Sequence, residues 1–401
     1  MASCSRDEAA SRAGVEPSFV DRLVETGILH PDPPDRFSPG DVRRIQMLRS
    51  LEETGISLDG VAEAMRRGTV SFDFFDAAAY ERFAVLSSET FAEVSARTGI
   101  PIELLMVVRE SIGLAQPAPD DLVREDELSI VPFLELQLRE GFRLAAIERL
   151  LRVYGDSTRR IAEQEAAWWQ SEVIDPAVAA GMGPEDVGNA QLADRTTPLA
   201  EEAVLAIYHA QQARAWTANI IGGVEGMLTA AGLHSRLERP PALCFLDITG
   251  YTRLTQERGD EAAAELATTI SALVRRSSVQ HGGKPIKWLG DGVMLLYREP
   301  GSGVASALEM VDQLASAGLP PAHVGLHAGP VLFQEGDYYG QTVNLSARIA
   351  DYARPGEVLV SQAVAEASSG RSIGFRDIGP VELKGVAGTV HLLLAHHAVN
   401  G

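Results

Sequence analysis

The stretch Ala242-Leu243-Cys244-Phe245-Leu246-Asp247-Ile248 is an apolar run with one acid near its end. Two prolines precede it and Thr249-Gly250 follows it, so turn residues bound the run on both sides. A short apolar run of this kind is typical of a strand buried on both faces. We therefore predict a central strand that ends in a carboxylate.

The residues after this strand predict an alternation of helices and strands. An amphipathic helix is expected over 261–279, a strand over 285–289, the turn Gly290-Asp291-Gly292, a strand over 293–297, a helix over 304–317 and a strand over 323–327. The order β-α-β-β-α-β is that of a ferredoxin-like α+β fold, in which the first strand lies beside the third. Asp247 and Asp291 are therefore expected to meet at one edge of the sheet.

Two carboxylates at adjacent strand ends suit a pair of hard divalent cations. Mg²⁺ takes few protein ligands and completes its shell with water and phosphate oxygens. Other interpretations exist for each residue alone, because Asp-Gly also favours a hairpin turn and acids are common at strand ends. The metal hypothesis thus depends on the two residues together.

Six motifs occur in order along the C-terminal part of the chain: "FLDITGYTRL", "KWLGDGVMLLY", "GLHAGPV", "GDYYGQTVNLSARI", "PGEVLVS" and "LKGV". In sequence and spacing they resemble the catalytic domain of class III nucleotidyl cyclases. The resemblance covers about residues 240–395. A helical N-terminal half before such a domain is similar to the soluble adenylate cyclases of actinobacteria.

The resemblance implies a role for each matching residue. Asp247 and Asp291 would bind two Mg²⁺ or Mn²⁺ ions per site, with the Ile248 carbonyl as a further ligand. The other implied roles are purine recognition by Lys287 and Asp337, ribose orientation by Asn344, transition-state stabilisation by Arg348 and a triphosphate contact by Lys384. In this family the metal-binding residues of one chain and the purine, ribose and transition-state residues of another chain build each site. The resemblance therefore implies a homodimer.

The chemistry of these residue types agrees with the implied roles. Asn344 and Arg348 are four residues apart and share one face of a helix, and a guanidinium donates several hydrogen bonds to a phosphate. A lysine donor beside an aspartate acceptor matches adenine N1 and its amino group, whereas guanine presents the reverse pattern. We therefore expect ATP as the substrate, with a guanylate cyclase as the alternative.

The N-terminal residues predict a duplicated helical arrangement. The segment "FSPGDVRRIQMLRSLEETGISLDGVAEAM" at 37–65 resembles a MerR-type winged helix-turn-helix. Glycine and apolar positions recur 86 residues later, as in Gly27 with Gly113 and Gly55 with Gly141, which favours duplication over chance. We predict related modules over 1–80 and 81–160, a helical connector over 161–239, and the cyclase-like domain over 240–398.

The connector carries an apolar stripe from Leu199 to Met227 at helical spacing. Such a stripe is typical of a packed core or of a dimerisation helix. His209 and His234 lie on or just after it and could make the protein respond to pH. A small molecule, a lipid or a protein could equally be the regulator of the N-terminal half.

The charge distribution argues against a protein that wraps nucleic acid. Residues 1–235 contain 38 acids and 21 bases, whereas residues 236–401 contain 17 acids and 14 bases, for a total of 55 − 35 = 20 excess negative charges. DNA binding needs a basic face, so any groove contact would come from Arg43, Arg44 and Arg49. A DNA-binding regulator with a nucleotide-sensing, non-catalytic cyclase domain remains the alternative function.

Two cysteines, Cys4 and Cys244, exclude a disulfide framework and fit a reducing compartment. No apolar run approaches the roughly 18 residues of a membrane span. We therefore expect a soluble cytoplasmic protein.

Overall fold

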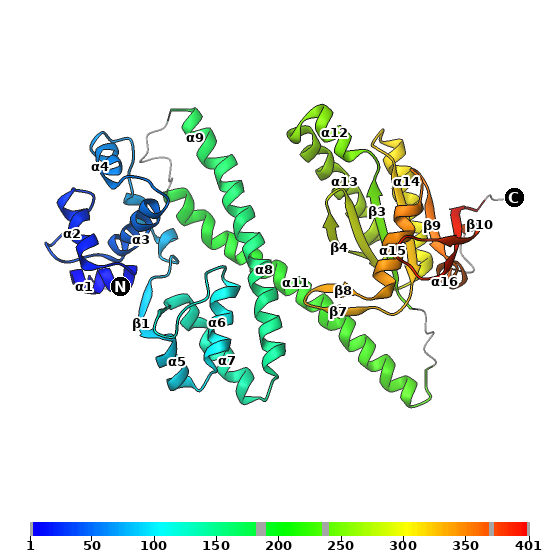
Figure 1. Cartoon of the computed structure of the whole chain (residues 1–401), viewed down its shortest axis with the longest axis horizontal. Helices are drawn as coiled ribbons and strands as arrows, with labels where there is room; N and C mark the ends of the chain where they lie inside the picture. The colour runs from blue at the N-terminus through cyan, green and yellow to red at the C-terminus, as the bar shows by residue number, and fades with distance from the viewer. Residues whose placement is uncertain (1–2, 182–189, 235–239, 369–372, 399–401) are drawn as a thin grey trace. The chain divides into compact units, whose positions relative to one another are not determined.

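The computed structural model describes residues 3–181, 190–234, 240–368 and 373–398 (Figure 1). The chain divides into two compact units, Met1–Gly223 and Val224–Gly401. Of the helices in these described segments, none combines the length and the apolar character that a membrane span requires.

The N-terminal unit contains two successive groups of helices. The first group consists of α1 (Arg6–Ala13), α2 (Pro17–Glu25), α3 (Pro39–Glu53) and α4 (Leu58–Arg66), followed by the 3₁₀ turns η1 (Asp73–Asp76) and η2 (Ala78–Tyr80). The second group consists of β1 (Leu86–Thr90), α5 (Phe91–Thr98), α6 (Ile102–Ser111), β2 (Leu122–Arg124), α7 (Glu125–Arg139) and α8 (Leu144–Trp169). Each group has its own buried apolar cluster, so each packs as a module.

The two groups share their local signals as well as their order. Ser5 and Thr90 cap α1 and α5, and each forms a reciprocal capping box with a glutamate three residues later. Gly14 and Gly99 end the same two helices in the left-handed conformation, which glycine adopts without steric cost. The two groups thus begin with the same capping signals, while the duplication and the winged helix-turn-helix assignment stay predictions.

Long helices follow the modules. After α8, the π-helical turn η3 (Gln170–Ile174) leads into α9 (Asp175–Ala179), where Pro176 removes a backbone donor and disturbs the helical hydrogen bonding. Helix α11 (Ala190–Ala230) has 41 residues, so most of the described residues of the predicted connector are helical. Its large apolar side chains are exposed in the single chain, including Leu199, Trp216, Ile220 and Met227.

The described residues of the C-terminal unit form a seven-stranded sheet. Its strands are β3 (Ala242–Ile248), β4 (Gly283–Leu289), β5 (Gly292–Tyr297), β6 (Ala322–Ala328), β9 (Val358–Ser361), β10 (Ile373–Glu382) and β11 (Thr389–His397). Their order is β10-β11-β9-β6-β3-β5-β4. The segment β6-β3-β5-β4 has the predicted ferredoxin-like order, with the first strand beside the third, and β9, β11 and β10 extend it.

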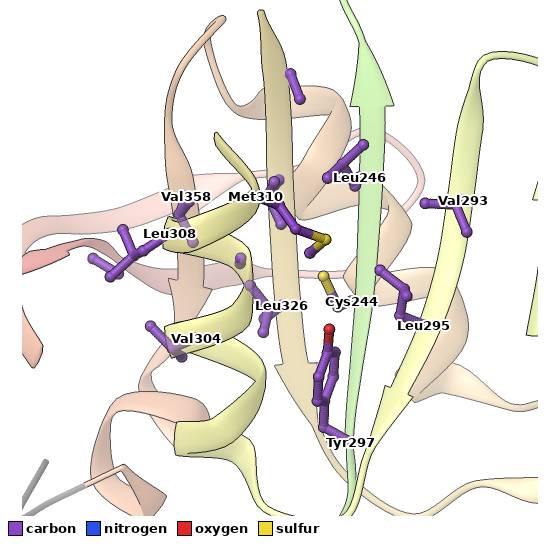
Figure 2. Close-up of a cluster of buried hydrophobic side chains, with 14 of the residues drawn as sticks. Cys244, Leu246, Val293, Leu295, Tyr297, Val304, Leu308, Met310, Leu326 and Val358 are labelled. Atoms are coloured by element: carbon purple, nitrogen blue, oxygen red, sulfur yellow. The ribbon is translucent and has the colours of Figure 1, made fainter. Parts of the chain in front are cut away.

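Helices cover the sheet and bury the apolar run of β3. They are α12 (Tyr251–Arg258), α13 (Asp260–Gln280), α14 (Pro300–Ser316), α15 (Gln341–Tyr352) and α16 (Gln362–Ala367). Figure 2 shows side chains of α14 packed against β3, β5 and β6. Met310 of α14 lies in the same cluster as Cys244 of β3 and Leu326 of β6. Tyr297 is fully buried there, and its hydroxyl donates to the Ser306 hydroxyl at 2.8 Å. The ends of β3 and β5 are held in place by this core.

Candidate active site

Asp247 lies near the end of β3, between a glycine and a histidine of the neighbouring strands. The register pairs it with Gly292 of β5 on one side and with His323 of β6 on the other. A Cβ atom at position 292 would lie 2.9 Å from Asp247 Oδ1, which is closer than real Cβ contacts. The glycine after the turn is therefore required for the carboxylate to lie against the hairpin.

The β4–β5 turn brings a second carboxylate close to the first. Gly290 has a φ of 68°, which suits glycine, and Asp291 follows it in the turn. Burial and the negative charge of Asp291 raise the pKa of Asp247, and His323 opposes this rise. The predicted convergence of the two acids at the edge of the sheet agrees with the structure.

The donor set at this edge fits a hard divalent cation. Two carboxylates of like charge disfavour each other, and a cation between them would relieve the repulsion. In the part of the chain that the structure describes, no three His, Cys, Asp or Glu side chains converge on a metal position. A bound ion would therefore need further ligands besides the two carboxylates.

The predicted purine-reading pair is brought together across 50 residues of sequence. The Lys287 ammonium, on β4, forms an ion pair with the carboxylate of Asp337, the first residue of β8 (Asp337–Tyr339). The other Asp337 oxygen accepts the Tyr338 backbone N–H at 2.8 Å. The donor and the acceptor expected for adenine thus lie side by side.

Helix α15 carries Asn344 and Arg348 on its exposed face. Its opposite face packs on β6, where a Cβ atom at Gly325 would lie 2.1 Å from the Ala350 backbone nitrogen. Buried Thr342 donates to the Pro330 carbonyl at 2.7 Å and holds the first turn of the helix. Arg348 donates to Asp351 at 2.6 Å, three residues further along.

Lys384 lies in the exposed connection between β10 and β11. The preceding residue, Leu383, packs in a cluster with Ile349 of α15. In the described segments no hydrogen bond or ion pair joins Lys384 to the other predicted site residues. Lys384 thus directly follows a residue that packs against α15, the helix that carries Arg348. The role of Lys384 stays a prediction.

The predicted site residues form separate groups within one chain. The carboxylate pair lies at the β3 and β5 ends, the Lys287–Asp337 pair joins β4 to β8, and α15 carries the third group. For the residues with described side chains, no ion pair links the carboxylate pair to either other group. A cavity of about 530 Å³ lies beside the carboxylates, lined by Ile248, Tyr251, Trp288 and Asp291 together with residues of α13.

Two neighbours of Asp247 were missed in the sequence. Thr249 and His323 contact each other, and the His323 ring faces the Asp247 carboxylate. The only sequence signal was a histidine at the start of the last strand of the predicted βαββαβ unit. Recognising His323 as a neighbour of Asp247 requires the pairing of that strand with the first strand, which places the two residues opposite each other.

The arginines considered for DNA contact are bound within their own unit. Arg43 is buried and donates twice to the Phe75 carbonyl, at 2.8 and 3.2 Å. Arg44 pairs with Asp41 at 2.8 Å and with Asp76, and Arg49 pairs with Glu53 at 2.8 Å. These arginines therefore do not form a free basic face.

Comparison with known proteins supports the resemblance drawn from the motifs. Residues 238–396 match the family model described as "Adenylate and Guanylate cyclase catalytic domain". The C-terminal unit thus carries a nucleotidyl cyclase type of catalytic domain, and the match does not extend to the helical unit.

Related proteins cover more of the chain. The chain is 26% identical to a pH-sensitive adenylate cyclase of Mycobacterium tuberculosis over 313 aligned residues. The aligned region covers 75% of this chain and 76% of that protein. It is also 26% identical over 272 residues to an adenylate cyclase of Streptomyces coelicolor, covering 67% and 68% of the two chains. A solved adenylyl cyclase, CyaB from P. aeruginosa, has 21% identity and a TM-score of 0.37, covering 40% of this chain and 96% of that one.

Proposed function

We propose that this protein is an adenylate cyclase that converts ATP to 3′,5′-cyclic AMP and pyrophosphate. The observation that carries the proposal is the presence, in one cyclase-type domain, of the Asp247–Asp291 carboxylate pair and the Lys287–Asp337 ion pair. The first suits metal-bound phosphates and the second suits adenine. The two relatives named as adenylate cyclases support the same activity.

The reaction joins the ribose 3′-oxygen to the α-phosphorus and releases pyrophosphate, so catalysis depends on positioning and charge stabilisation. Two Mg²⁺ or Mn²⁺ ions, when bound by Asp247, Asp291 and the Ile248 carbonyl, would acidify the 3′-hydroxyl and neutralise phosphate charge. Lys287 would donate to adenine N1 while Asp337 accepts from the amino group.

Helix α15 would supply the remaining contacts. Asn344 would orient the ribose, and Arg348 would exchange its Asp351 partner for the phosphate on which charge develops. Lys384 would contact the triphosphate.

We also propose that each active site is shared by two chains of a homodimer. The resemblance to class III cyclases supports this arrangement, because in that family the metal-binding residues of one chain and the base, ribose and arginine residues of the other build each site. The exposed apolar side chains of α11 suit a partner helix, through which the N-terminal half would set the catalytic activity. The regulating signal would be a small molecule, a lipid, a protein or a change of pH.

The activity is tested by incubating the purified full chain with ATP and Mn²⁺ and measuring cyclic AMP. Asp247→Ala should reduce the product to background, and Arg348→Ala should lower kcat by about 10²- to 10³-fold. Asp312→Ala is a matched control, because this exposed carboxylate of the same unit pairs with His397. Equal activity in all the variants would contradict the mechanism, and a preference for GTP would favour the guanylate cyclase.

Mixing the two inactive variants tests the shared site. A dimer of one Asp247→Ala chain and one Arg348→Ala chain contains one intact site, so the mixture should regain part of the activity. No recovery after subunit exchange would contradict a shared site.

The alternative of a DNA-binding regulator has less support. It requires basic residues that face solvent, whereas Arg43, Arg44 and Arg49 are bound within the N-terminal unit. A gel-shift experiment with duplex DNA, with and without ATP, should show no salt-sensitive complex.

A further inference from the structure

A short relay of side chains connects the β3–α12 turn to the carboxylate of Asp247. The Asp247 carboxylate has Oδ1 against Gly292, and its Oδ2 lies 3.4 Å from His323 Nε2. The other ring nitrogen, Nδ1, lies 3.1 Å from the Thr249 hydroxyl oxygen. The three residues thus form a line from Thr249 through the ring to the acid.

The backbone fixes this relay. Asp247 and His323 are direct partners in the antiparallel pairing of β3 with β6, so their side chains leave the same face of the sheet. The Thr249 backbone N–H donates to the Pro321 carbonyl at 2.9 Å, which holds the turn beside the start of β6. The His323 side chain is 16% exposed against 44% for Asp247, so the ring lies deeper than the carboxylate.

We propose that His323 is a positioning residue that orients the Asp247 carboxylate for metal binding, with Thr249 setting the orientation of its ring. In this proposal the Thr249 hydroxyl would donate to Nδ1, which would leave the ring proton on Nε2, facing Oδ2. Asp247 Oδ2 lies 3.4 Å from Nε2, so the ring limits the orientations open to the carboxylate. Outer partners of this kind tune metal ligands in many proteins.

The inference rests on the proposed function, because it assigns the partner of a proposed metal ligand. It also differs from a purely structural role for the histidine. A structural histidine would change the stability of the domain and leave its affinity for metal unchanged, whereas a positioning histidine changes the affinity in a folded protein.

The test measures Mn²⁺ binding by the full chain in the presence of α,β-methylene ATP, which cannot be cyclised. Bound Mn²⁺ is followed by the loss of the free-ion EPR signal, and folding by the melting temperature. His323→Leu should weaken Mn²⁺ binding about 10-fold. His323→Gln should restore it to within about threefold, because the Gln amide nitrogen is as many bonds from Cα as His Nε2 is.

A second readout separates affinity from turnover. In the cyclase assay, His323→Leu should raise the Mn²⁺ concentration for half-maximal activity about 10-fold, while most of kcat returns at saturating Mn²⁺. His391→Leu is the matched control, because His391 also pairs with an aspartate, Asp377, at 2.6 Å in the same unit. It should leave Mn²⁺ binding unchanged.

Unchanged Mn²⁺ binding in a folded His323→Leu protein would overturn the inference. If that variant does not fold, Thr249→Val decides, since it keeps the ring and removes the hydroxyl. It should weaken Mn²⁺ binding about threefold, and unchanged binding would again overturn the inference. A chain that makes no cyclic AMP but shows the His323 effect would refute the proposed reaction alone.

Discussion

Arg43 and Arg44 in the N-terminal unit are bound by carbonyl and carboxylate oxygens of that unit, whereas Asp247 in the C-terminal unit lies close to a second carboxylate. The first arrangement satisfies its charges internally. The second leaves like charges together, with the pKa of Asp247 raised by burial and by Asp291. Clusters of the first kind stabilise a fold, and clusters of the second kind are common at functional sites.

The largest expected effect concerns the Lys287–Asp337 pair, and it tests whether these polar residues of the C-terminal unit bind the substrate. Lys287→Glu should lower kcat/KM for ATP by about 10²- to 10⁴-fold, because the hydrogen-bond donor beside Asp337 is replaced by a second acceptor. Lys284→Glu is the matched control, since Lys284 lies exposed on the same strand and undergoes the same charge change. Steady-state kinetics with ATP measure both, and equal losses would remove the distinction between the two lysines.

An intermediate effect concerns the N-terminal arginines. Arg43→Ala should lower the free energy of unfolding of the N-terminal unit by about 1–3 kcal/mol, because the buried Phe75 carbonyl loses both donated hydrogen bonds. Arg49→Ala removes only exposed ion pairs and should stay within about 0.5 kcal/mol. Urea unfolding of the full chain measures both, and an equal cost for both would contradict a structural role specific to Arg43.

The smallest effect concerns a histidine whose role is structural within the C-terminal unit. Burial lowers the pKa of His327, whose Nδ1 lies 2.8 Å from the Ser361 hydroxyl. The folded unit therefore binds this proton less readily than the unfolded chain does. The resulting stability is present above the ordinary histidine pKa of about 6.5 and is lost as the pH falls towards the lowered value.

His327→Gln should therefore reduce the fall in melting temperature of the C-terminal unit between about pH 7.5 and pH 5.5. Calorimetry of the full chain measures this fall, and exposed His391 provides the comparison through His391→Gln. An unchanged fall in His327→Gln would show that other groups carry the pH dependence.

Much of the C-terminal fold could be predicted from the sequence. The apolar run of β3 and the Gly-Asp-Gly turn led to the ferredoxin-like order, and the resemblance to class III nucleotidyl cyclases led to Lys287 and Asp337 as a pair. The strands β9, β10 and β11 were not predicted, because their places in the sheet depend on pairing with residues far away in sequence. The relay through His323 was missed for the same reason.

In the N-terminal half, the helices could be predicted but the partners of the charged side chains could not. Capping residues and turn glycines are local signals, so the helices could be predicted. The hydrogen bonds of Arg43 could not be predicted, because its partner is a backbone carbonyl 32 residues away. A sequence shows that an arginine is charged and does not show whether that charge is already bound.

By itself, the sequence determined most helices, the strands of the βαββαβ unit and which residue types are available for chemistry, because these depend on local patterns and side-chain identity. Only the tertiary structure decided where β9, β10 and β11 join the sheet, that Asp247 meets His323, and that Arg43 meets the Phe75 carbonyl. The physical reason is that electrostatic and hydrogen-bond energies depend on distance and burial in three dimensions, which separation along the chain does not specify.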